Sequence, residues 1–205
     1  DSSTKLRSVL VRARVVQNPP LPLPSSRIRC RTVIVFLFAL TFRRYFYHRS
    51  ASDLLIPKVG KGARKTNYDY TKGKLPEMID VICKSGCRLF VCAVGVPPSW
   101  MVDRLHAAGV RVMSMVGSPR HVPKCLDAGV DLLCAQGTEG GGHTGELGTL
   151  VLIPQIVDLC KGKRSRLTNA PIYVVAAGGI YDGRTMAASF ALGAVGVWVG
   201  TRFLA

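Results

Sequence analysis

From about residue 75 onward the chain repeats one unit: an amphipathic helix, a short turn with glycine, and an apolar strand. Within residues 75–83, apolar side chains fall at positions i, i+3, i+4 and i+7, which is the pattern of a helix with one buried face. Residues 89–94 are apolar without alternation, as in a strand that is covered on both faces. Strands that alternate with helices at intervals of about twenty residues predict right-handed βαβ units and a parallel sheet.

The same unit recurs to the end of the chain. We predict further helices over residues 98–108, 119–127 and 184–192, and further strands over residues 53–57, 111–116, 131–136, 172–177 and 195–199. Gly86, Gly109, Gly129 and Gly193 are the expected helix ends, because glycine readily adopts the left-handed conformation that ends a helix. The interval between the strands that begin at 131 and 172 is about double the others, which predicts an insertion after Gln136.

Three loops rich in glycine follow predicted strand ends, at residues 136–145, 177–183 and 200–202. Parallel α/β folds bind ligands at the carboxyl ends of their strands, so we expect the functional site among these loops. The last two loops follow consecutive strands, and each offers backbone N–H groups to an anion. This pairing favours a phosphate site over simple tight turns.

The loop at residues 136–145 carries His143 directly after three glycines, Gly140 to Gly142. Histidine is the side chain best suited to take a proton near neutral pH, and the glycines let the backbone lie flat against a planar ring. An equally open interpretation is that His143 only hydrogen-bonds to a neighbouring loop. We expect Glu139 either beside His143 or in solvent, and His106 and His121 on the outer surface.

The charge of the chain is strongly basic, with a formal net charge of +16. Residues 1–52 hold ten of the 28 lysines and arginines and one acidic residue, Asp1, without a known recognition motif. We therefore interpret residues 1–50 as a separate basic segment, disordered or artefactual, and predict no nucleic-acid partner. The apolar run at residues 32–42 is too short to span a bilayer and lies too deep for a signal peptide, so no membrane association is expected.

The seven cysteines are odd in number and form no CxxC pair. This arrangement is typical of reduced thiols in an intracellular, cytoplasmic protein, and it predicts no metal site.

Three motifs in order identify a resemblance to a known family. They are Ala-Gln-Gly-Thr-Glu-Gly-Gly-Gly-His-Thr-Gly at 135–145, Ala-Ala-Gly-Gly-Ile at 176–180, and Val-Gly-Thr-Arg-Phe at 199–203. Together they resemble the nitronate monooxygenase (2-nitropropane dioxygenase-like) family, over about residues 53–205. The resemblance implies an α/β fold, namely a partial (β/α)8 TIM barrel in residues 51–205 that comprises strands three to eight and lacks the N-terminal strands.

The resemblance also implies an FMN cofactor at the mouth of the barrel. The flavin ring would lie beside Gln136 and Gly141, and the residues expected at the FMN ribityl phosphate are Gly178, Gly179, Gly200 and Thr201. His143 would be the catalytic base that takes the α-proton of a nitroalkane, or would otherwise lie over the bound nitronate. The implied substrates are an alkyl nitronate or nitroalkane and dioxygen, and the products a carbonyl compound and nitrite.

The sequence leaves two alternatives open. A flavin-dependent enoyl-acyl carrier protein reductase shares the fold and similar glycine loops. An inactive truncated product is the other, because the opening strands and the last helix of the barrel have no counterpart in the sequence. We expect the 205 residues to behave as a fragment, unstable or free of flavin; the oligomeric state is undetermined.

Overall fold

The computed structural model of the chain describes residues 36–38, 51–55, 71–93 and 95–203. Its strands are β1 (Phe36–Phe38), β2 (Ala51–Leu55), β3 (Leu89–Ala93), β4 (Arg111–Val116), β5 (Leu132–Gln136), β6 (Tyr173–Ala177) and β7 (Gly196–Trp198). They form one sheet in the order β1-β7-β6-β5-β4-β3-β2. Strands β2 to β7 are all parallel, and each pairs with the next along the chain. The predicted α/β class with a parallel sheet is confirmed.

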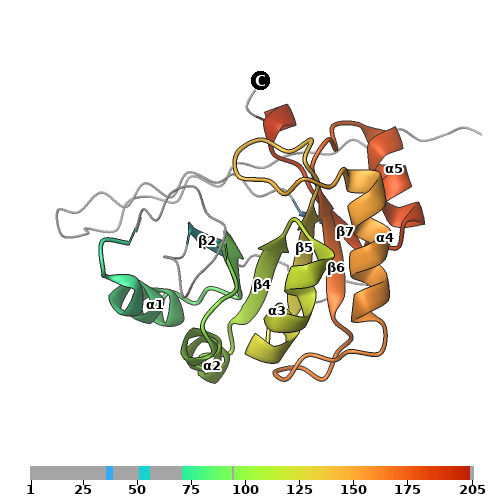
Figure 1. The fold of residues 1–205 in the computed structure, drawn as a ribbon. Helices are drawn as coiled ribbons and strands as arrows, with labels where there is room; N and C mark the ends of the chain where they lie inside the picture. The colour runs from blue at the N-terminus through green and yellow to red at the C-terminus, as the bar shows by residue number, and fades with distance from the viewer. Residues whose placement is uncertain (1–35, 39–50, 56–70, 94, 204–205) are drawn as a thin grey trace, which may run out of the picture.

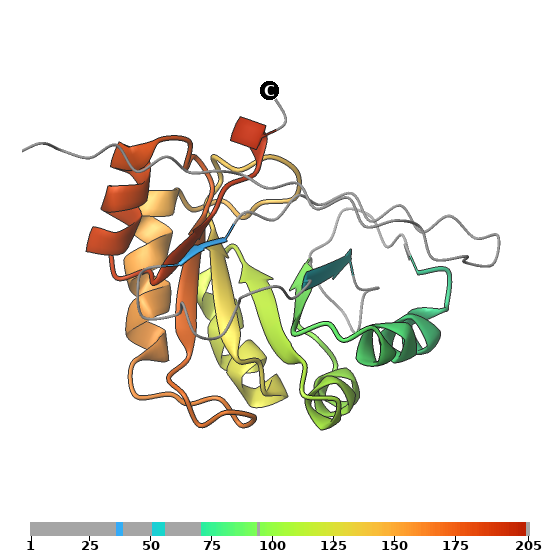
Figure 2. The same ribbon diagram turned by 180° about the vertical axis from the view of Figure 1, so that it is seen from behind.

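Helices connect these strands and cover one face of the curved sheet, as Figures 1 and 2 show from opposite sides. They are α1 (Leu75–Lys84), α2 (Ser99–Ala107), α3 (Val122–Ala128), α4 (Thr149–Cys160) and α5 (Gly183–Ala191), with short 3-10 turns η2 (Pro119–His121) and η3 (Thr201–Phe203). Four of the helices lie where the periodicity predicts them. The four glycines expected to end helices all have positive φ; Gly129, with φ +93°, is the left-handed C-cap of α3.

Helix α4 was not predicted as a helix; its residues fell within the predicted insertion. Its sequence is almost entirely apolar and contains Pro154, so the helical period is weak. The helix forms because Leu152, Ile153 and Ile156 are fully buried against the sheet. Tertiary packing therefore decides this element, and the insertion is a loop of residues 137–148 followed by a regular crossover helix.

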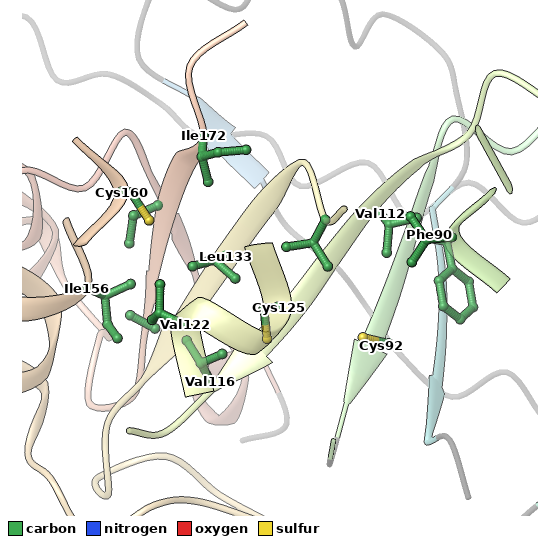
Figure 3. Packing of buried hydrophobic residues seen from close by; sticks show 14 of the residues in the cluster. Phe90, Cys92, Val112, Val116, Val122, Cys125, Leu133, Ile156, Cys160 and Ile172 are labelled. Carbon is green, nitrogen blue, oxygen red and sulfur yellow. The ribbon is translucent and has the colours of Figure 1, made fainter. Parts of the chain in front are cut away.

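Apolar side chains fill both faces of the sheet. On the helix-covered face, Phe90, Val112 and Leu133 of successive strands are fully buried with residues from the helices, as Figure 3 shows. Alternate residues such as Leu89 and Met113 form a second buried cluster on the other face. The absence of polar alternation in the strand sequences is explained by this two-sided burial.

A buried carboxylate joins four segments at the amino ends of the strands. Asp131, 3% exposed, accepts hydrogen bonds from the Val112 amide at 2.7 Å and the Ser165 hydroxyl at 2.5 Å. His106 Nε2 of α2 lies 2.9 Å from the same carboxylate, and its side chain is only 13% exposed. The expectation that His106 lies on the outer surface is wrong, because the helix turns this ring inward to Asp131.

Strand β1 lies in the segment where the sequence indicated no element. It pairs antiparallel with β7, in the register Phe36 to Trp198. The boundary between residues 50 and 51 stays a prediction, since most of residues 1–50 lie outside the described residues. Among the residues that the structure describes, no helix is both long and apolar enough to cross a membrane.

Candidate active site

The loops after β5, β6 and β7 lie at the same end of the sheet. In Figure 1 the loop after β5 arches over the end where η3 stands. The Gly137 amide donates to the carbonyl of Ala177 at 2.9 Å, which joins the first loop to the second. A Cβ added to Gly141 would lie 3.5 Å from Thr201 Oγ1, which places the first loop against the third. The parallel topology thus gathers the three glycine motifs, as their positions after strand ends predict.

The loop of residues 137–148 is fixed to the start of α4 by Glu139. Its carboxylate accepts the Thr149 amide at 3.0 and 2.9 Å, and Thr149 Oγ1 lies 2.7 Å from Oε2. Burial raises the pKa of Glu139, but the hydrogen bonds from the Thr149 hydroxyl and from backbone amides together outweigh it, so the pKa lies below its ordinary value. Glu139 is therefore a carboxylate that caps α4. It is no hydrogen-bond partner of His143, which corrects one of the two expectations for it.

The turn after β6 is in direct contact with this anchor. Thr149 Oγ1 lies 2.9 Å from the carbonyl oxygen of Gly178. Gly178 and Gly179 have φ values of +96° and +67°, which side chains rarely adopt. A Cβ at Gly178 would lie 2.8 Å from the carbonyl oxygen of Gly137, so two backbones approach each other closely here. Glycine is required at Gly178 by conformation and by space together.

The turns after β6 and β7 contain backbone amides without an acceptor among the described residues. Within the described part of the chain, the amides of Gly178, Gly179, Gly200 and Thr201 donate to no acceptor. A Cβ at Gly200 would meet no atom within 4 Å, which leaves that turn open. An anion could therefore accept hydrogen bonds from both turns.

The amino end of α5 is capped by a carboxylate of its own chain segment. Asp182 accepts hydrogen bonds from the amides of Arg184 and Thr185, and the Thr185 hydroxyl oxygen accepts one from the Asp182 amide. The hydrogen bond from Thr185 lowers the pKa of Asp182 to about 2. A second negative charge at this helix end would meet the Asp182 carboxylate. In the part of the chain that the structure describes, the glycine turns after β6 and β7 have no such carboxylate cap.

His143 and Gln136 occupy the loop that faces these turns. His143 is exposed, and it makes no hydrogen bond or ion pair within the residues described. Gln136, at the end of β5, donates from Nε2 to the carbonyl oxygen of Gly141 at 3.4 Å. This contact holds the glycine run over the strand end, and the imidazole is left available to a substrate.

The sequence interpretation missed Thr149, Gly117 and the role of Glu139 as a cap. Glu139 and Thr149 are ten residues apart, and their pairing depends on the path of the loop, which no local pattern records. Gly117, after β4, contacts the first loop so closely that a Cβ would lie 2.6 Å from the amide nitrogen of Gly145. Its place after a strand end is the one signal that could have identified it.

A parallel sheet with helices on its outer face and glycine-rich loops at its carboxyl end is the architecture of TIM-barrel enzymes. Solved structures of this kind are similar to the chain. Nitroalkane oxidase from Streptomyces ansochromogenes matches with a TM-score of 0.61 and 25% identity, over 76% of this chain and 50% of that one. FabK from Thermotoga maritima matches with a TM-score of 0.60 and 28% identity, over 80% of this chain and 45% of that one.

The sequence profile of the nitronate monooxygenase family matches residues 58–205. The chain belongs to this family of flavin-dependent oxidoreductases. Rv1533 of Mycobacterium tuberculosis, a monooxygenase by name, is 45% identical over 133 residues, which are 65% of this chain and 33% of the relative. A hydroxy-methyl-oxo-octahydroindene-carboxyl-CoA dehydrogenase of Rhodococcus jostii is 41% identical over 129 residues, 63% of this chain and 33% of the relative. The chain spans about a third of the length of these relatives.

Proposed function

We propose that the chain is the part of an FMN-dependent nitronate monooxygenase that carries the catalytic base and the phosphate-binding turns. The observation that carries this proposal is the contact between the loop of His143 and the turn of Thr201. A Cβ added to Gly141 in the first loop would lie 3.5 Å from Thr201 Oγ1. This contact brings the proton acceptor and the anion donors to one end of one sheet. In this proposal β2 to β7 correspond to the third to eighth strands of the barrel.

The residues present fit FMN. Its phosphate would accept hydrogen bonds from the amides of Gly178, Gly179, Gly200 and Thr201, which have no acceptor within the described chain. Gly141 lacks a side chain where the flavin ring would lie, and Gln136 is held beside it. When bound, FMN supplies the oxidation of the nitronate and passes the electrons to dioxygen, with a carbonyl compound and nitrite as products.

The role of His143 in this proposal is to take the α-proton of a nitroalkane. The imidazole is exposed and makes no bond within the described residues, so one ring nitrogen can accept this proton. The three glycines before it allow the loop to bring the ring over a bound substrate. A neutral nitroalkane needs this step, whereas a nitronate has already lost the proton.

This difference between substrates provides the test. Purified chain is titrated with FMN and followed by absorbance, and the loaded protein is then mixed anaerobically with propionate 3-nitronate or with a neutral nitroalkane. The proposal requires that the chain binds FMN, contrary to the expectation of a flavin-free fragment, and that both substrates bleach the bound flavin. In His143→Ala, FMN binding stays, and reduction by the neutral nitroalkane slows by about 10²- to 10⁴-fold, the usual contribution of a general base. Reduction by the nitronate slows less.

Equal slowing with both substrates would contradict the role as base, and lack of flavin binding would contradict the FMN site. A second candidate is redox chemistry on an acyl thioester, such as enoyl-acyl carrier protein reduction. This candidate is supported by the 41% identity to a dehydrogenase that is named for a carboxyl-CoA substrate. NADH consumption with an enoyl thioester, and no bleaching by nitronate, would support this candidate instead.

A further inference from the structure

Thr149 joins the loop after β5 to the turn after β6. Its hydroxyl oxygen lies 2.7 Å from Glu139 Oε2 and 2.9 Å from the carbonyl oxygen of Gly178, and its residue is 9% exposed. The hydroxyl has one proton, which these two acceptors share. The site of this contact is crowded, because a Cβ at Gly137 would collide with the same hydroxyl. The side chain therefore has little freedom to turn away.

The bond to Gly178 also sets the direction of a neighbouring donor. A peptide group is planar and trans, so the carbonyl of Gly178 and the amide N–H of Gly179 point in opposite directions. Since Thr149 draws the Gly178 carbonyl towards α4, the N–H of Gly179 is directed away from α4. Glycine at positive φ offers little resistance to rotation of this peptide by itself. The hydroxyl contact supplies the missing constraint.

Glu139 in turn holds Thr149. Its carboxylate accepts the Thr149 amide through both oxygens, and a carboxylate at a helix amino end is also favoured by the helix dipole. A Cβ at Gly179 would lie 3.2 Å from Glu139 Cβ, so the glutamate also packs beside the turn that it supports. The three groups form a continuous connection from the His143 loop to the Gly178–Gly179 turn.

We propose that Glu139 and Thr149 are positioning residues that orient the Gly179 N–H for the phosphate of the cofactor. The inference rests on the proposed FMN site. It follows that the pair determines the preference for FMN over riboflavin, which has the same ring and no phosphate. The cap of Asp182 uses the amides of Arg184 and Thr185, so these two donors of α5 are not available to the phosphate.

The test compares affinities for FMN and riboflavin in wild type, Thr149→Val, Thr149→Ser and Thr144→Val. Valine keeps the shape of threonine and removes the hydroxyl; serine keeps the hydroxyl. Thr144 is an exposed threonine of the same loop that makes no hydrogen bond to the described residues, which makes Thr144→Val the matched control. In Thr149→Val we expect the FMN dissociation constant to rise about tenfold, as for the loss of one hydrogen bond, and that of riboflavin to stay within about twofold. Thr149→Ser and the control retain the preference.

An equal loss of both affinities, or a preference unchanged in Thr149→Val, would overturn the proposal. Hydrogen–deuterium exchange separates this failure from failure of the FMN site. If the pair orients the turn, amide exchange in residues 177–181 is faster in Thr149→Val and Glu139→Gln than in wild type or in Glu146→Gln, without any flavin present. Unchanged exchange overturns the inference. Faster exchange in a protein that binds no flavin supports the role of Glu139 and Thr149 in orienting the turn and contradicts the proposed cofactor.

Discussion

Single polar residues hold the two ends of the sheet in different ways. At the amino ends of the strands, Asp131 receives donors from three other segments in a buried position. At the carboxyl ends, Glu139 and Asp182 cap helices and are partly in solvent. The buried carboxylate therefore contributes to stability, and the exposed ones mainly shape the site.

Substitution of Asp131 tests the buried junction. Asp131→Ala removes the acceptor of the Val112 amide and the Ser165 hydroxyl and leaves both buried, which we expect to cost about 2–5 kcal/mol of unfolding free energy. Urea denaturation followed by circular dichroism measures it. Asp158→Ala is the control: it breaks an exposed ion pair with Lys161 and should cost less than about 1 kcal/mol. A similar loss of unfolding free energy in both variants would show that the hydrogen bonds of Asp131 do not stabilise the fold more than an exposed ion pair does.

The cap of α5 has a predictable pH dependence. The pKa of Asp182 is lowered to about 2, mainly by the hydrogen bond from Thr185, so its contribution to stability is present above the ordinary aspartate pKa and is lost as the pH falls towards 2. Asp182→Asn keeps a capping side chain without this titration. We expect the difference in thermal midpoint between wild type and Asp182→Asn to change between about pH 4 and pH 2. A constant difference would contradict the assignment.

Among the elements, the turn after β6 depends on a close contact between two backbones. Gly178 has φ +96° and no room for a Cβ, whereas Gly162 has φ +73° and nothing within 4 Å of the added atom. Gly162→Ala therefore costs only the conformational penalty, about 1 kcal/mol. Gly178→Ala adds a collision with Gly137, and we expect a larger loss of stability together with loss of FMN binding.

Thermal unfolding of both glycine variants, with an FMN titration of each, provides the measurement. Equal destabilisation would mean that the two loops do not approach as closely as the structure shows. A variant at Gly178 that retained full FMN affinity would separate this turn from the phosphate site.

The molecule as a whole encloses most of its thiols. No disulfide joins the six described cysteines; Cys83 is half-buried and the other five are buried. Burial raises the pKa of Cys160 to about 11, and the neighbouring Cys125 adds to the effect, so little thiolate is present at pH 8.

Thiol reactivity therefore reports on the integrity of the sheet and its helices. In a Cys30→Ser variant at pH 8, we expect one thiol, Cys83, to react with an aromatic disulfide reagent in the native protein. The remaining five should react only in denaturant, in a single phase. Rapid reaction of all six without denaturant would show that the 205-residue chain does not maintain this core, as the sequence interpretation of a fragment predicts.

The sequence by itself determined the repeating unit of the fold and the positions of the glycine motifs, because burial on both sheet faces and helix ends at glycine leave local patterns. The parallel order of β2 to β7 and the joint location of the three loops follow from those patterns. His143 and the turn glycines were identified in the same way, and their roles stay proposals.

Only the tertiary structure decided the elements and contacts that join distant segments. Helix α4 forms because its residues pack on the sheet, although its own sequence has a weak period and an internal proline. His106 turns inward because Asp131, 25 residues later, accepts from it. The bond of Glu139 to Thr149 depends on the closure of a loop between them. A hydrogen bond between distant residues leaves no periodic pattern in the sequence. Such a pair is therefore identified only in the folded structure, where the two partners lie side by side.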